Sequence, residues 1–390
     1  MEHRIAGRMD RLQTESAFQI LAKATELEAR GKQVIHLEIG QPDFKTPPNI
    51  IAAAHRAMEE GKTGYGPTVG IPPLREAIAQ YCRDYKGVEA ASDEVVVCPG
   101  GKPVMFFSLL MLCQEGDEVI YPDPGFPIYQ SVINFSGARG VPMPLLDKNN
   151  FRPDLELLKK SINDKTRLII LNNPANPTGA MFGAEDIRAI ADLVREREIY
   201  ILSDEIYDRI YYGEKPLSIA SLPGMKERTI ILDGFSKTYA MTGWRLGYAV
   251  LHRDLAERMG MLMVNSVSCA ATPTQWGALE ALQGNQDAVA EMCAAFRERR
   301  DFLVASLNSI QGISCAVPEG AFYAFPNISS FGLSSKEFAD RLLEEGGVAA
   351  AGGTGFGVQG EGFLRISYAN SLENIKIALD RINDFVKTIR

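Results

Sequence analysis

Residues 229–237 read Thr-Ile-Ile-Leu-Asp-Gly-Phe-Ser-Lys, and this stretch decides the fold class of the 390-residue chain. Its apolar, β-branched start predicts a strand that is buried on both faces, as in a parallel sheet. The strand runs into a turn that ends at Lys237. Because open α/β sheets bind ligands at the carboxyl ends of their strands, this lysine is expected beside a ligand site.

Similar apolar runs alternate with helical patterns from residue 92 to residue 250, which indicates βαβ units. We therefore predict an α/β fold with a mostly parallel sheet sandwiched by helices. Helices are expected from Ile71 and over 187–194, where apolar residues recur at helical spacing. The predicted strands are Val95–Cys98, Glu118–Tyr121, Arg167–Leu171, Ile199–Ser203, Thr229–Leu232 and Leu246–Leu251.

After Gln275 the pattern changes to long charged helices, which predicts a second, smaller α+β domain. Its helices are expected over Ala288–Leu307 and from Leu372, and a helix over Phe18–Ala29 is expected to join it. These boundaries divide the chain into an N-terminal arm (1–15), a small domain (16–45 plus 286–390) and a large domain (46–285).

Composition limits the function classes. Lys and Arg total 41 against 49 Asp and Glu, so the net charge of −8 gives no electrostatic reason to expect nucleic acid or an anionic membrane as a partner. No stretch approaches the roughly 20 apolar residues of a spanning helix, and the first ten residues lack the apolar core of a signal peptide. Six scattered cysteines and four isolated histidines predict a reduced cytoplasmic protein without a metal site.

Two polar residues beside Lys237 suit a ligand with several functional groups. Asp204 follows the run that begins at Ile199, where a carboxylate would hold the ring nitrogen of a heteroaromatic ligand protonated; taken alone, a helix N-cap is the more common role. Lys237 taken alone is more often a solvated charge, although a lysine of lowered pKa forms an imine with an aldehyde. The planar fork of Arg245, eight residues further on, suits a phosphate.

Two loops supply further candidates. Gly101 and Lys102 open a helix after a strand, and backbone N–H groups at such a turn bind phosphate, although a plain turn is an equal alternative. The segment matches neither a P-loop nor a dinucleotide fingerprint. Asn176 lies in the loop Asn-Pro-Ala-Asn-Pro-Thr-Gly (173–179), which is expected to aim its amide into the same site.

Phe126 and Arg365 complete the set. Phe126 presents a flat face for a ring, although a core position is equally common for one phenylalanine. Arg365 lies in a strand-like run and suits bidentate capture of a carboxylate, although a lone arginine there is more often a surface residue. Together the candidates fit one set of ligand groups: an aldehyde, a ring nitrogen, a phosphate and a substrate carboxylate.

This set strongly resembles the class I/II aminotransferases of the aspartate aminotransferase type, which are pyridoxal 5′-phosphate (PLP) enzymes of fold type I. The resemblance covers nearly the whole chain, in the order in which the family has its motifs. The motifs are Gly-Tyr-Gly-Pro-Thr-Val-Gly-Ile-Pro-Pro-Leu-Arg (64–75), Asn-Pro-Thr-Gly (176–179), Ser-Asp-Glu-Ile-Tyr (203–207), Ser-Lys-Thr-Tyr-Ala-Met-Thr-Gly-Trp-Arg-Leu-Gly-Tyr (236–248) and Leu-Arg-Ile-Ser-Tyr-Ala (364–369).

The resemblance implies an activity, a cofactor and an assembly. The protein would move the amino group of an L-amino acid, aspartate or a similar donor, to a 2-oxo acid such as 2-oxoglutarate. Lys237 would hold PLP as a Schiff base and carry the proton between the substrate Cα and the cofactor C4′. Tyr65 would reach the active site of a second subunit, which implies a homodimer with shared sites.

The resemblance also implies a role for each remaining candidate. Asp204 would keep the pyridinium nitrogen charged, Tyr207 and Asn176 would hydrogen-bond the ring hydroxyl oxygen, and Phe126 would stack on the ring. The implied phosphate ligands are Arg245, Ser236, Gly101 and Lys102, and the implied ligands of the substrate carboxylate are Gly40, Asn176 and Arg365.

Some residues depart from the family pattern. Gly234 stands where many relatives have a phosphate-binding serine, and Pro103 replaces the usual glutamine, so the phosphate contacts are expected to differ in detail. Residues 350–353 lack a proline that many relatives have before the Phe-Gly at 356–357, which leaves the side-chain pocket undefined. Lys102 would suit a distal substrate carboxylate, although a solvated lysine is about as common.

Two other functions are alternatives to transamination. A PLP-dependent lyase on the same fold is the nearest alternative, because one cofactor chemistry serves several outcomes. The ligand-sensing domain of a transcription regulator is disfavoured, since only about 15 residues precede the first predicted helix, too few for a helix-turn-helix module.

Overall fold

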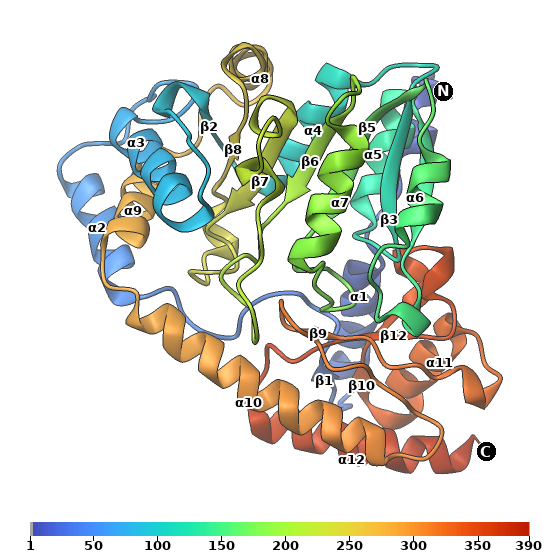
Figure 1. Cartoon of the computed structure of the whole chain (residues 1–390). Coiled ribbons are helices and arrows are strands. Elements are labelled where there is room, and N and C mark those ends of the chain that lie inside the picture. The colour runs from blue at the N-terminus through green and yellow to red at the C-terminus, as the bar shows by residue number, and fades with distance from the viewer. Residues whose placement is uncertain (1–2, 390) are drawn as a thin grey trace.

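A seven-stranded sheet dominates the computed structural model, which describes residues 3–389 (Figure 1). Its strand order is β2-β8-β7-β6-β5-β3-β4, and every neighbouring pair is parallel except the two that involve β8. The predicted mostly parallel α/β sheet is therefore confirmed. The strands are β2 (Val95–Cys98), β3 (Glu118–Asp123), β4 (Arg139–Pro144), β5 (Thr166–Asn172), β6 (Tyr200–Asp204), β7 (Thr229–Gly234) and β8 (Gly247–Val250).

Alternate residues of each strand pack into separate cores on the two faces of the sheet, as the pleat requires. Val96 packs with residues of α4 and α8, whereas Val95 and Val97 pack with residues of α3 and α9. Both faces are thus covered, which explains the unbroken apolar runs in the sequence. The helices around the sheet are α2 (Pro48–Glu59), α3 (Pro72–Tyr81), α4 (Gly101–Leu112), α5 (Ile128–Ser136), α6 (Leu155–Ser161), α7 (Ala184–Val194), α8 (Arg253–Ser266) and α9 (Thr272–Gln283).

One strand of the large sheet was missing from the sequence prediction. The strand β4 pairs only with β3, at the edge of the sheet, and contains Pro142 and Pro144. Proline weakens the strand pattern in a sequence, yet an edge strand tolerates it because one side needs no partner. Within residues 3–389, no helix is both long and apolar enough to cross a membrane.

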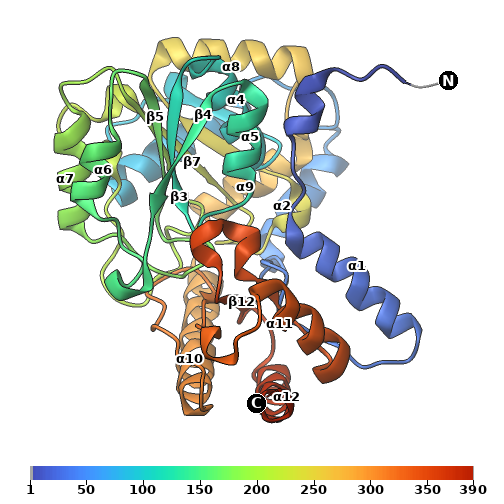
Figure 2. The same cartoon turned by 90° about the vertical axis from the view of Figure 1, so that its right-hand side faces the viewer.

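A smaller unit lies below the carboxyl ends of the large sheet and is built from both ends of the chain (Figures 1 and 2). Its short strands form a parallel pair, β1-β10, and an antiparallel set, β11-β12-β9. The elements are α1 (Ser16–Ala29), β1 (Ile35–His36), α10 (Asp287–Ser309), β9 (Tyr323–Ala324), α11 (Ser335–Arg341), β10 (Val348–Ala349), β11 (Ala351–Gly352), β12 (Leu364–Ser367) and α12 (Leu372–Thr388).

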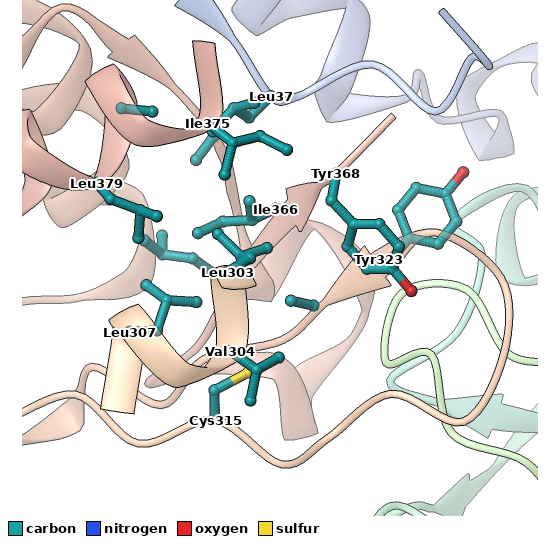
Figure 3. Close-up of a cluster of buried hydrophobic side chains, with 14 of the residues drawn as sticks. Leu37, Leu303, Val304, Leu307, Cys315, Tyr323, Ile366, Tyr368, Ile375 and Leu379 are labelled. Atoms are coloured by element: carbon teal, nitrogen blue, oxygen red, sulfur yellow. The ribbon is translucent and has the colours of Figure 1, made fainter. Parts of the chain in front are cut away.

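One hydrophobic cluster joins the segments of this unit. Leu37 after β1, Leu303 in α10, Ile366 in β12 and Leu379 in α12 lie together in it (Figure 3). The predicted helices at both chain ends are present, but the domain boundaries themselves stay a prediction, and residues 1, 2 and 390 of the predicted arm and small domain lie outside the described residues. The cluster also contains Tyr207, Ile210 and Tyr212, so it joins the segment after β1 and the strand β12 to the loop that follows β6.

Candidate active site

The carboxyl ends of β5, β6 and β7 face the smaller unit across a cavity of ≈ 640 Å³. All the predicted site residues except Tyr65 line it, although they come from segments far apart in the sequence. They are Gly40, Gly101, Lys102, Phe126, Asn176, Asp204, Tyr207, Ser236, Lys237, Arg245 and Arg365.

A hollow of ≈ 730 Å³ lies at the opposite edge of the sheet, beside the amino ends of β3, β5 and β6. It is lined by surface segments such as 110–114 and 163–167, and none of the predicted site residues contributes to it. Ligands of open α/β sheets bind at the carboxyl edge, so the cavity around Lys237 is the candidate active site.

Lys237 lies half-buried in the cavity wall, three residues beyond the end of β7. Its ammonium donates a hydrogen bond to the carbonyl oxygen of Gly40. Removal from bulk water lowers the pKa of Lys237 to about 8, and the positive charges of Arg365, Arg245 and Lys102 add to the shift. A neutral amine is therefore accessible near pH 8, as a nucleophilic lysine requires.

Asp204 is the last residue of β6 and is buried. The Tyr129 hydroxyl donates to its Oδ2 at 2.6 Å, and the backbone N–H of Ile206 donates to its Oδ1 at 3.3 Å. Burial is the main reason why its pKa rises to about 6. Residues 206–209 form a turn, so the helix N-cap role considered for Asp204 is wrong. A cationic ring nitrogen beside this carboxylate would keep it ionised.

Arg365 is buried on β12, so the surface position considered for it is also wrong. Its guanidinium donates to the Glu38 carbonyl oxygen and, at 3.2 Å, to Asn176 Oδ1. The rings of Tyr323 and Phe356 each lie 4.7 Å from the guanidinium carbon. Its Nε–H, however, has no partner among residues 3–389. A buried donor without a partner costs about 1–3 kcal/mol, so this position is prepared for an anionic acceptor.

Tyr207 and Asn176 lie on the wall between Asp204 and Arg365. The Tyr207 hydroxyl lies 2.8 Å from that of Tyr323, and the Asn176 backbone N–H donates to Asn172 Oδ1 at 2.8 Å. The Asn172 contact fixes the loop, so the Asn176 side chain reaches Arg365 rather than the solvent.

Gly100, Gly101 and Arg245 form a tight pocket wall at the start of α4. Gly100 has a φ of +96°, and a Cβ there would lie 2.4 Å from Arg245 Nη2. Arg245 also donates to the Thr242 carbonyl oxygen at 2.9 Å. The arrangement places a guanidinium against the free N–H groups of a helix N-terminus, which is a favourable site for a phosphate.

Gly234 has a packing reason to lack a side chain. It pairs with Gly247 across β7 and β8, and a Cβ on Gly234 would lie 2.8 Å from the Gly247 Cα. A serine at this position would push the two strands apart. The hydroxyl that many relatives have here is thus replaced by close backbone packing, while the buried Ser236 remains in the cavity wall.

Phe126 and Tyr65 differ in their placement. Phe126 lines the cavity and contacts Tyr129 edge to face, with ring centroids 5.7 Å apart. Tyr65 lies in the loop between α2 and α3 with 93% of its surface exposed, and it does not line the cavity of its own chain. The cavity residues that were not predicted include Glu15, Tyr129 and Tyr323, whose polar groups contact Lys102, Asp204 and Tyr207 in turn. Their sequence contexts are ordinary helix and strand patterns that carry no chemical signal.

The chain matches the family model described as aminotransferase class I and II over residues 32–382. It is 39% identical to an aspartate aminotransferase of Pyrococcus abyssi, over 97% of this chain and 98% of that protein. It is 38% identical to an aromatic-amino-acid aminotransferase of Thermococcus litoralis, over 97% and 98%. The solved structure of aspartate aminotransferase from Thermus thermophilus with maleate superimposes with a TM-score of 0.95 at 35% identity, over 98% of this chain and 100% of that one.

Proposed function

The chain belongs to the class I and II aminotransferases and is a PLP-dependent transaminase, and we propose that its reaction takes place in the cavity around Lys237. The donor is an L-amino acid, aspartate or a similar one, and the acceptor is a 2-oxo acid such as 2-oxoglutarate. The observation that carries this proposal is the half-buried Lys237 amine, with its pKa near 8, in one cavity with Asp204 and Arg365. The relatives are named as aminotransferases, so the lyase alternative is not carried forward.

The cavity offers a suitable residue for each functional group of PLP. A Cβ on Gly100 would collide with the Arg245 guanidinium, so the glycine lets Arg245 lie close to the start of α4, where the guanidinium and the backbone of Gly101 would bind the phosphate. Asp204 offers a carboxylate to the ring nitrogen, and Phe126 offers an aromatic face. The Arg365 guanidinium, whose Nε–H lacks a partner among the described residues, would bind the substrate carboxylate together with the Asn176 amide and the backbone of Gly40.

Bound PLP supplies an aldehyde and a protonated ring that accepts electrons from the substrate Cα. Lys237 then moves the proton, since its amine is neutral at mildly alkaline pH and is held by the carbonyl of Gly40. Asp204 keeps the ring protonated. The ring centroid of Tyr207 lies 5.9 Å from the Lys237 ammonium, and its hydroxyl is positioned by that of Tyr323.

A half-reaction with one substrate tests the proposed function. When the PLP-loaded protein is mixed with aspartate alone, we expect its absorbance to change to that of the pyridoxamine form, because the amino group stays on the cofactor. A lyase would instead release ammonia and return to the starting spectrum. Absence of conversion with every member of a panel of amino acids would contradict transamination.

Substitution of Arg365 by lysine should lower kcat/KM by about 10²-fold, since one charge-assisted hydrogen bond contributes about 1.5–3 kcal/mol. Lysine keeps the charge but loses the planar fork that binds a carboxylate through two N–H groups. Steady-state kinetics with saturating acceptor measure the loss. The exposed Arg30, at the end of α1, is the matched control, and Arg30→Lys should leave kcat/KM unchanged. An unchanged value for Arg365→Lys would remove Arg365 from the substrate site.

We also propose a homodimer with shared sites and a cytoplasmic location. The exposure of Tyr65 outside the cavity of its own chain supports a role in the partner subunit's site. All six cysteines lie within the described residues and are free, as expected in a reducing compartment. The proposed small domain, 16–45 plus 286–390, would close over the substrate and exclude water.

A further inference from the structure

Glu15 forms an ion pair with the ammonium of Lys102 in the cavity. Without this pair, the ammonium would be available to bind a second anionic group of a ligand. Lys102, in the first turn of α4, has a side chain that is 49% exposed and forms an ion pair with Glu15, whose side chain is only 14% exposed. Both residues line the cavity. The positive charge of Lys102 therefore faces a carboxylate that the protein itself supplies.

Glu15 is not held in this position by the helix that follows it. It is the N-cap residue of α1, yet its side chain accepts no hydrogen bond from the first turn of that helix. Glutamate is a poor N-cap compared with aspartate, asparagine or serine. The carboxylate is thus directed to Lys102 and the cavity rather than to its own helix.

The other cations of the cavity have separate tasks in the proposed reaction. Arg365 and its partner Asn176 face the substrate carboxylate, and Arg245 lies on the glycine turn. Apart from Lys237, which the proposed reaction uses, Lys102 is the remaining cation on the cavity wall, among the residues that the structure describes, for a second carboxylate on the substrate. A dicarboxylic substrate that uses Lys102 meets the negative charge of Glu15 beside the same ammonium, and Glu15 must move away before that ammonium is fully available.

A substrate with an uncharged side chain does not compete with Glu15 for Lys102. The rings of Phe18 and Phe126 lie 5.9 and 5.7 Å from the Lys102 ammonium and border the same end of the cavity. An aliphatic or aromatic side chain would pack against these rings and leave the ion pair in place. A carboxylate at the same end would meet the negative charge of Glu15.

We propose that Glu15 is a specificity-determining residue that competes with the distal carboxylate of a substrate for Lys102. Dicarboxylic donors must displace Glu15 from Lys102 or bind beside it against like-charge repulsion, whereas donors with uncharged side chains bind without either cost. This proposal rests on the proposed function and adds to it. The same cavity accepts dicarboxylic donors and donors with uncharged side chains, and Glu15 lowers kcat/KM for the dicarboxylic donors relative to the uncharged ones.

The substitution Glu15→Gln tests this role because it keeps the size of the side chain and removes its charge. The ratio of kcat/KM for aspartate to kcat/KM for phenylalanine should rise about tenfold, as expected when one charge-assisted hydrogen bond becomes available. Glu26→Gln, on the exposed face of the same helix, makes the same change of charge and should leave the ratio unchanged.

Equilibrium binding provides a second readout that does not depend on turnover. The affinity for succinate should rise in Glu15→Gln, while the affinity for 3-phenylpropionate should not, as measured by calorimetry on the PLP-loaded protein. A ratio that stays constant or falls, or succinate binding that does not change, would overturn the role of Glu15. Absence of conversion with any donor would instead contradict the proposed function, so the two failures are distinguishable.

Discussion

Lys237→Ala should abolish transamination, the largest loss of activity expected from any substitution in the cavity. In the proposed reaction the variant would lack the amine that accepts and returns the substrate proton, a task that alone contributes about 10²–10⁴-fold to a rate. It would also lack the proposed nucleophile that bonds the cofactor aldehyde. Turnover and the imine absorbance of the PLP-loaded protein should therefore disappear together, as followed by steady-state kinetics and by visible spectroscopy.

A control and a pH profile sharpen this test. Lys160→Ala, at an exposed position of α6, should leave both signals unchanged. In the unsubstituted apoprotein, the rate of PLP uptake should rise as pH increases through about 8, because burial and the nearby cations depress the pKa of Lys237 to that value. Retention of both turnover and imine absorbance in Lys237→Ala would show that another group performs the chemistry.

The fold was predictable because the sheet is buried on both faces. Six of the seven strands appear as short apolar runs, and the ends of helices such as α12 coincide with changes in the pattern. The edge strand β4 was missed because Pro142 and Pro144 interrupt its pattern. Tertiary position, at an edge with one open side, decides that this proline-containing segment is a strand.

The site was predictable to the extent that its residues follow strands. Asp204 and Lys237 lie at the ends of β6 and β7, where strand topology brings them to one edge. Tyr129 and Tyr323 were missed because a tyrosine among apolar residues has the same pattern whether its hydroxyl binds a carboxylate or points into a core. Glu15 was missed because its partner, Lys102, is 87 residues away along the chain.

Replacement of Lys86 by methionine should cause the largest loss of stability. Lys86 ends a π-helical turn, Cys82–Lys86, and its ammonium is buried against three carboxylates. It lies 2.9 Å from Glu205 Oε2 and 3.0 Å from Asp233 Oδ2, and it also contacts Asp208. Removal of one partner of a buried ion pair costs about 3–5 kcal/mol, because the remaining charges have left water without compensation.

This cluster lies behind the active site, on the other face of the sheet. Asp204 points to Tyr129 on the α5 side, whereas the neighbouring Ser203 and Glu205 hydrogen-bond each other at 2.9 Å on the Lys86 side. Lys86 thereby links the ends of β6 and β7 beneath the residues that line the cavity. Loss of these ion pairs should increase the mobility of both strand ends and lower the unfolding temperature.

The loss of folding stability caused by Lys86→Met should increase as the pH rises. Burial and Asp208 raise the pKa of Asp233 to about 7 even with Lys86 present, and removal of the ammonium raises it further. A carboxyl group whose pKa is higher in the folded state than in the unfolded state stabilises the fold at low pH, and this contribution is lost as pH rises through the folded-state pKa. Lys86→Met should therefore be tolerated better at pH 5 than at pH 8 in thermal unfolding.

Two comparisons separate this electrostatic cause from simple loss of packing. Lys387→Met removes an exposed lysine that pairs with Asp384 at 2.9 Å, and such surface pairs contribute only about 0–1 kcal/mol, so the variant should unfold like the parent. The double variant Lys86→Met, Asp233→Asn should be more stable at pH 8 than Lys86→Met alone, because one of the uncompensated carboxylates is gone. If the double variant were less stable, the uncompensated charge would not be the cause, and the role of Lys86 would be to fill space between the strand ends.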